Sequence, residues 1–159
     1  IIKNLKKNLQ IIEKELTRII KENQSIDQNY KLITSIPGVG KQTAIYLIIV
    51  TQNFTRFNTS RELACYAGVA PFPYQSGTSI NGRTKVNNLA NKKLKSLLNM
   101  CALTAKKYDF ELNEYYNRKV EEGKNKMLVL NNVRNKLLGR IFSVVNRQQP
   151  YVNTRKFAA

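Results

Sequence analysis

The stretch LITSIPGVGKQTAIYLIIV at residues 32–50 decides the fold of this chain. Two apolar segments flank the short turn PGVG at residues 37–40. The proline ends the first segment because it has no backbone N–H and its ring clashes with a preceding helical turn. The second segment begins at Lys41, and the two glycines of the turn permit a sharp change of direction. The sequence therefore predicts a pair of helices joined by a tight hairpin.

The same turn has the properties of a phosphate-binding element. Free amides at the start of the second helix donate hydrogen bonds to an anion, and the helix dipole favours negative charge there. The pattern resembles the helix-hairpin-helix family of DNA-binding motifs. That resemblance assigns nucleic-acid contacts to Gly38, Val39, Gly40 and Lys41. The alternative is that the glycines only let two helices pack closely.

The charge balance points to a polyanionic partner. The 159 residues include 27 Lys and Arg against 10 Asp and Glu, a formal net charge of +17. Nucleic acid is the leading candidate. A membrane surface is the alternative, but no apolar run approaches the roughly 20 residues of a spanning helix. The basic residues are also spread along the chain rather than gathered on one amphipathic helix.

The composition excludes several kinds of active site. The chain has no His, which removes the commonest general base. It has no carboxylate cluster of the kind that holds paired magnesium ions, and no cysteine spacing typical of metal sites. We therefore expect no metal and no cofactor in this part of the protein. Cys65 and Cys101 lie in apolar helical patterns, which predicts free buried thiols in a reducing cytoplasm.

The heptad spacing of apolar residues in residues 1–29 predicts a coiled-coil helix. Apolar side chains recur at alternating steps of three and four, with Asn23 at the one polar position of the series. A second chain would cover this stripe in a homo-oligomer, or an upstream helix of the same chain would cover it. Simple packing on the following domain is the alternative. The apolar positions are Ile2, Leu5, Leu9, Ile12, Leu16, Ile19 and Ile26.

The rest of the chain predicts a compact all-α domain. Residues 30–147 form the domain and residues 148–159 a flexible basic tail. Two prolines, three glycines and two serines between the apolar patch near Leu63 and the next helix predict a loop. A basic helix then spans about residues 86–107, and Asp109 caps another. In the last helix, Lys126–Arg147, we expect the charged residues Arg134, Lys136 and Arg140 to lie outside.

Four motifs occur in order along residues 30–145: IPGVGKQTA, RFNTSRELACYAGVAP, YQSGTSINGRTKV and VLNNVRNKLLGRIF. Together they resemble the C-terminal domain of the insertion-sequence 110 family of transposases. That resemblance implies a bacterial, cytoplasmic, nucleoid-associated protein that exchanges DNA strands under the direction of a bridging guide RNA. It also implies an N-terminal RNase-H-like domain with a DEDD acidic site, where Mg²⁺ is expected. Residues 1–29 would be the end of a longer linker.

The resemblance further implies a serine nucleophile, placed at Ser76 within QSG, with Ser79 as the fallback. A serine hydroxyl without a His needs cations that stabilise its alkoxide and the crowded phosphorane. Arg83, Lys85 and Lys92 are the candidates. From pattern alone, Ser76 is also well explained as a turn residue that bonds its own backbone.

Lys93 and Lys95 continue the basic helix and are candidates for nucleic-acid contacts, although a solvated helix face explains them equally well. The entry to this helix departs from the family pattern, with Ala90 where relatives tend to have glycine.

The leading hypothesis is therefore a recombinase domain that is inactive without its acidic partner domain. A non-catalytic helix-hairpin-helix DNA-binding module is the alternative. A structural coiled-coil adaptor ranks last because it leaves the charge unexplained.

Overall fold

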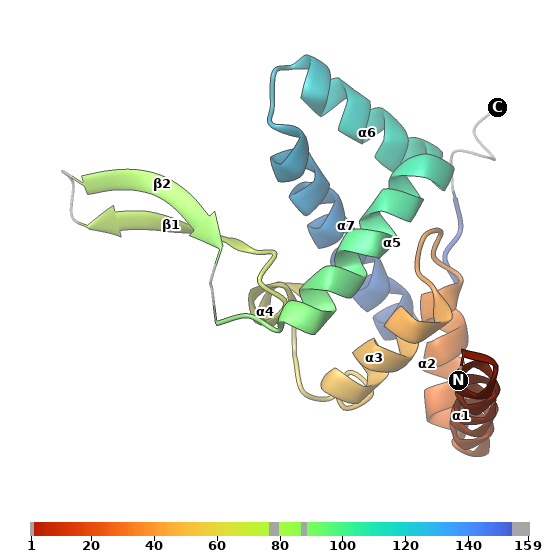
Figure 1. Ribbon diagram of the computed structural model, residues 1–159. Coiled ribbons are helices and arrows are strands. Elements are labelled where there is room, and N and C mark those ends of the chain that lie inside the picture. The colour runs from red at the N-terminus through yellow and green to blue at the C-terminus, as the bar shows by residue number, and fades with distance from the viewer. Residues whose placement is uncertain (1, 77–79, 87–88, 154–159) are drawn as a thin grey trace.

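The computed structural model describes residues 2–76, 80–86 and 89–153. The fold is predominantly helical, as predicted, with one antiparallel pair of strands among the described residues (Figure 1). The elements are α1 (Ile2–Glu22), α2 (Gln24–Thr34), α3 (Lys41–Val50), α4 (Ser60–Tyr66), β1 (Pro71–Ser76), β2 (Ile80–Val86), α5 (Lys92–Tyr108), α6 (Phe110–Glu121) and α7 (Lys126–Arg147).

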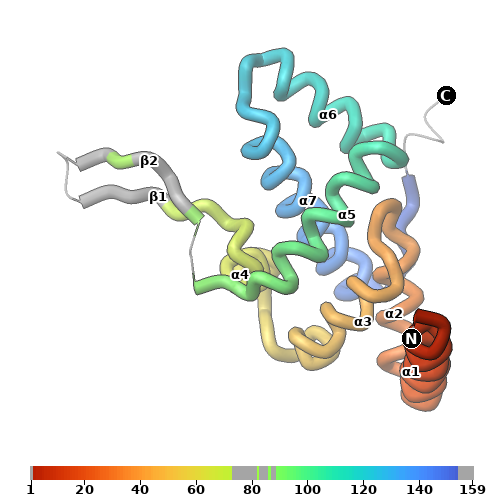
Figure 2. The backbone as a smooth tube through the Cα atoms, viewed as in Figure 1, coloured from red at the N-terminus to blue at the C-terminus, as the bar shows by residue number. Residues whose placement is uncertain are grey.

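Helix α7 forms the centre of the core. It packs against α2, α4, α5 and α6, and the tube in Figure 2 shows it running behind α5 through the middle of the body. Its apolar face recurs every three or four residues, which is the spacing of a helix buried along one stripe. Val133, Leu137, Leu138 and Ile141 on this face are fully buried. The predicted bounds of this helix, Lys126–Arg147, are confirmed.

Polar caps fix where several helices begin. The side chain of Thr59 accepts a hydrogen bond from the Glu62 amide at the start of α4, and that of Asp109 accepts one from the Leu112 amide at the start of α6. Each cap satisfies an amide that has no partner within the helix. The Asp109 cap confirms the sequence prediction.

The N-terminal helix differs from the predicted continuous coiled-coil helix. Helix α1 ends at Glu22, because Asn23 adopts extended backbone angles and its side chain caps α2 by accepting a hydrogen bond from Ile26 N. Asn23 is therefore a helix start and not a polar position within a continuous seam. Most apolar side chains of α1 are exposed, including Ile2 at 72% and Leu9 at 59%; Ile20 is the one classed as buried.

The segment predicted as a loop is instead a β-hairpin. Strands β1 and β2 pair antiparallel, with Pro71 opposite Val86 and Ser76 opposite Ile80. The register shifts between Phe72 and Tyr74, around Pro73, which has no N–H to donate to the ladder. The basic helix α5 consequently begins at Lys92, capped by Asn91, and not near residue 86 as expected.

Two of the three charged residues of α7 that we expected at the protein surface are instead largely buried. Arg134 is only 6% exposed. The Arg140 side chain is 14% exposed and donates to Asp109 Oδ2 at 2.9 Å and Glu111 Oε2 at 2.7 Å. Lys136 is exposed, as predicted.

Cys65 and Cys101 are both free thiols. Cys101 is buried as predicted, whereas Cys65 is partly exposed. Across the described segments, no helix combines the length and apolar content needed to cross a bilayer.

Candidate nucleic-acid interface

The turn between α2 and α3 is held in place by the core. Gly38 has φ +91, a region that L side chains rarely adopt. A Cβ at this position would lie 2.7 Å from both the Cβ and the backbone nitrogen of Ala105 on α5. Gly38 is therefore required by backbone conformation and by close packing. Close helix packing, the alternative explanation for the two glycines, therefore accounts for Gly38.

The second glycine has a different environment. Gly40 is exposed, has φ −86, and a Cβ there would meet nothing within 4 Å. Neither strain nor packing demands glycine at this position. Gly40 is the N-cap of α3 and makes no side-chain cap bond, so no cap side chain satisfies the first amides of the helix.

The predicted contact residues of this turn divide between core and surface. Val39 is buried, and its amide donates to Ile36 O at 3.0 Å, so its side chain serves packing. Lys41 and Gln42 are exposed. The first amide within α3 that bonds back along the helix is that of Ala44, to Gly40 O. The amides of residues 41–43 precede it and have no acceptor within the helix.

A depression of about 640 Å³ opens at this helix start. The depression is lined by all of residues 38–43 and by Leu97, Met100, Cys101 and Thr104 of α5. Glu13 of α1 lines it as well. A carboxylate thus lies beside the positive end of α3, where it lowers the local positive potential.

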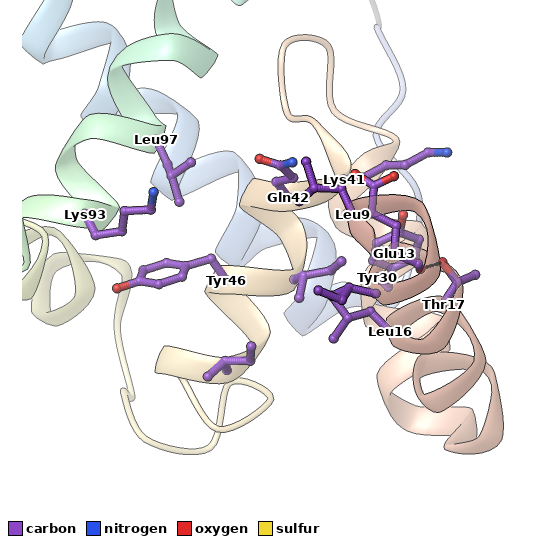
Figure 3. A pocket seen from close by; sticks show the side chains of 13 residues that line it. Leu9, Glu13, Leu16, Thr17, Tyr30, Lys41, Gln42, Tyr46, Lys93 and Leu97 are labelled. Carbon is purple, nitrogen blue, oxygen red and sulfur yellow. Dashed lines mark hydrogen bonds between the residues drawn. The ribbon is translucent and has the colours of Figure 1, made fainter. Parts of the chain in front are cut away.

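The sequence patterns indicated Lys41 and Lys93 as separate candidates for nucleic-acid contacts. In the structure both line one groove of about 380 Å³ between α1, α3 and α5. Figure 3 shows Lys93 reaching in from α5, Lys41 at the start of α3, and Leu9 and Leu16 on the α1 side. The groove wall is largely apolar. Burial, followed by the nearby charge of Asp27, raises the pKa of Tyr30 in this wall above its ordinary value.

The basic first turn of α5 is anchored by Asn91. Its amide donates to Tyr66 O at 2.9 Å, and its side-chain nitrogen donates to the Tyr66 hydroxyl at 3.0 Å. Its side-chain oxygen accepts from Leu94 N at 2.8 Å and from the Tyr46 hydroxyl at 3.2 Å. This network ties α3, α4 and α5 together. It therefore fixes the helix start that presents the exposed Lys92 and Lys93 and the half-buried Lys95.

The candidate nucleophile belongs to the hairpin. Ser76 is the last residue of β1, at the end of the ladder away from Pro71 and Val86. The side chains of Ser76, Arg83 and Lys85 lie outside the described residues, as does Ser79 altogether. Backbone pairing places Lys85 opposite Phe72, four positions along β1 from Ser76, or about 13 Å at 3.3 Å per residue.

The structure also identifies residues that the sequence interpretation missed. Asn91, Asn131 and Arg134 form hydrogen-bond networks next to the two ends of the hairpin. The spacing of Arg134, four residues after Leu130 and three before Leu137, places it on the apolar stripe of α7. That spacing was sufficient to predict its burial, but its charge suggested the surface.

Comparison with known sequences agrees with the motif order. The profile described as "Transposase IS116/IS110/IS902 family" matches residues 30–117, more than half of the chain. The chain belongs to this transposase family.

Family relatives place the chain within longer proteins. It is 27% identical over 141 residues to the pilin gene-inverting protein of Moraxella lacunata, covering 88% of this chain and 44% of that protein. It is 38% identical over 93 residues to the insertion element IS110 uncharacterized 43.6 kDa protein of Streptomyces coelicolor, covering 58% of this chain and 23% of that protein. The chain therefore spans less than half the length of these relatives.

Proposed function

We propose that this chain is the DNA-binding and strand-exchange domain of an insertion-sequence transposase, with Ser76 as its nucleophile. The observation that carries the proposal is the start of α3, where Gly40 is exposed, the amides of residues 41–43 have no acceptor within the helix, and Lys41 lines one groove with Lys93. Family membership supports the reaction class. The names of its relatives, an insertion-element protein and a gene-inverting protein, fit DNA rearrangement.

Binding at the helix-hairpin-helix turn follows from this geometry. A phosphate at the start of α3 accepts hydrogen bonds from the amides of residues 41–43 and is favoured by the helix dipole. Lys41 and Lys93 add mobile charge on either side, and Lys95 extends the basic surface along α5. These contacts carry no base information, so sequence choice is assigned to a pairing guide RNA.

The proposed chemistry is a transesterification. The Ser76 hydroxyl loses its proton and its oxygen bonds to the scissile phosphorus. The bond from phosphorus to the neighbouring sugar oxygen breaks, and that oxygen takes up a proton. The phosphodiester is conserved as a protein–DNA ester, so the strand can be rejoined to a new end. Arg83, Lys85 and Lys92 are assigned to stabilise the negative charge of the phosphorane.

The proposal includes the remainder of a longer protein. An acidic RNase-H-like domain would supply Mg²⁺, which provides Lewis-acid stabilisation of phosphate charge. Helix α1, most of whose apolar side chains are exposed, is assigned to contact between copies of the protein.

A denaturing gel tests the reaction. In the complete protein with its guide RNA and DNA, we expect a covalent protein–DNA species that Ser76→Ala abolishes while nucleic-acid affinity is retained. Retention of the species in Ser76→Ala would reject Ser76 as nucleophile. Its loss only in Ser79→Ala would move the role to Ser79.

A non-catalytic helix-hairpin-helix binding module is the second candidate, favoured by the same open helix start. It predicts that affinity falls steeply with salt while no covalent species forms under any condition.

A further inference from the structure

Arg134 has an environment that its role in packing does not explain. It lies on the apolar stripe of α7 and is 6% exposed. Its guanidinium donates to two neutral oxygens, Asn99 Oδ1 at 2.5 Å and Asn131 Oδ1 at 3.4 Å. Its Nε is buried and has no partner among the described residues. Burial lowers the pKa of Arg134 below its ordinary value, although the group remains charged.

This arrangement costs stability. A buried charge that meets only neutral acceptors is not repaid for its lost hydration, and well-packed apolar replacements of buried charges are often neutral or stabilising. A long apolar side chain at position 134 would satisfy the core equally well. The bonds that Arg134 makes must therefore serve something other than packing.

One of those bonds leads to the hairpin. Arg134 donates to the side-chain oxygen of Asn131, and the nitrogen of the same amide donates to Val69 O at 2.8 Å. Val69 lies two residues before Pro71, where β1 begins. Because the guanidinium occupies the oxygen side of the amide, it holds the nitrogen side toward the start of the hairpin.

The other bond leads to the basic helix. Asn99 is on α5, four residues after Lys95 and seven after Lys92, so these three residues share one face of the helix. Arg134 thus lies between the face that presents these two lysines and the root of β1. In Figure 1 the hairpin leaves the helical body beside α4 and the start of α5.

We propose that Arg134 is a positioning residue that, through Asn131 and Asn99, fixes the root of the β1–β2 hairpin relative to the basic start of α5. The consequence for Ser76 rests on the proposed function: the hairpin would be set where its serine meets the phosphate that the lysines hold. The positioning of the hairpin itself does not depend on that chemistry.

Distances between spin labels test the positioning directly. Labels are placed at Gln75→Cys in β1 and Arg118→Cys in α6, with Cys65 and Cys101 replaced by serine and alanine. We expect a narrow distance distribution in the parent, and one about twofold broader in Arg134→Met and Asn131→Ala, since a local restraint is lost without global unfolding. The melting temperature should be unchanged or raised in Arg134→Met.

Matched controls come from the same helix. Asn135 and Lys136 are exposed on α7, so Asn135→Ala removes the same amide group and Lys136→Met the same unit of positive charge away from the cluster. Both should leave the distribution narrow. An unchanged distribution in both Arg134→Met and Asn131→Ala would overturn the inference, as would a parent distribution that is already as broad.

A kinetic measurement separates this inference from the proposed function. In the complete protein, Arg134→Met should slow covalent adduct formation by about 10²-fold at saturating DNA, the order expected for a displacement near 1 Å, with DNA affinity unchanged. An unchanged adduct rate would overturn the catalytic consequence. If Ser76→Ala still forms the adduct, the proposed function fails, whereas the label distances still decide the role of Arg134.

Discussion

The two segments that carry the candidate site differ in what holds them. The turn at residues 37–40 is anchored in the core, with Val39 buried and Gly38 pressed against Ala105, while Gly40 is exposed. The hairpin of β1 and β2 is tied to polar groups next to its two ends, through Val69 on one side and Asn91 on the other. The turn is shaped by core packing, whereas the hairpin extends from the core, which holds only its root through the buried Val69 and Ala70 and a few hydrogen bonds.

This difference separates binding from chemistry. A turn that the core already holds in place would bind phosphate, as proposed, without a cost of ordering. A hairpin that the core holds only at its root would be reoriented more easily than the body unfolds, so we expect polar substitutions near the root to affect geometry before stability.

Gly38→Ala should destabilise the domain by more than about 3 kcal/mol, because it adds positive-φ strain and a steric overlap with the α5 backbone. Urea unfolding followed by circular dichroism measures it. Gly123→Ala is the matched control: Gly123 also has positive φ, +80, but a Cβ there meets nothing within 4 Å. That control should cost only about 1 kcal/mol. Equal costs would show that packing on Ala105 is unimportant.

Gly40→Val should leave the stability within about 1 kcal/mol and weaken DNA binding by about tenfold, because a branched side chain obstructs the amides of α3. Fluorescence anisotropy with a labelled duplex measures the affinity. Full affinity in a folded Gly40→Val protein would mean that the turn does not grip phosphate.

Lys41→Gln and Lys93→Gln should each reduce the slope of log affinity against log salt by about 1, since each removes one phosphate contact. Lys136→Gln, on the exposed side of α7, controls for net charge. A slope that changes equally in all three variants would indicate diffuse attraction rather than a defined interface.

Glu13→Gln should strengthen binding by roughly two- to fivefold, because its carboxylate lies beside the positive end of α3. Glu121→Gln changes net charge equally from the exposed end of α6 and should have no comparable effect. Weaker binding in Glu13→Gln would contradict the placement of phosphate at this helix start.

The sequence predicted the helical body well because caps and periodicity are local. Lys41 and Lys126 begin their helices, and Asp109 caps its helix, where the pattern placed them. The prediction for Asn23 was wrong because asparagine suits both a polar position in a heptad seam and a helix N-cap. In the structure its side chain makes the capping hydrogen bond of α2.

The hairpin and the buried arginine could not be predicted by the same means. Prolines and glycines in residues 68–86 are typical of loops, whereas the strand pairing depends on backbone bonds between distant residues. For the candidate site, the sequence indicated Lys41 and Lys93 but not that one groove contains both. It also assigned the same role to Gly38 and Gly40. In the structure only Gly38 packs against Ala105, so the two glycines differ in role.

The covalent intermediate provides the most direct test of the central claim. Trypsin digestion of the DNA-linked protein should yield the peptide of residues 62–83 carrying a nucleotide, and fragmentation by mass spectrometry should locate that nucleotide on Ser76. A nucleotide on Tyr74 or in a different peptide, or the absence of any linked nucleotide during efficient strand exchange, would contradict the account.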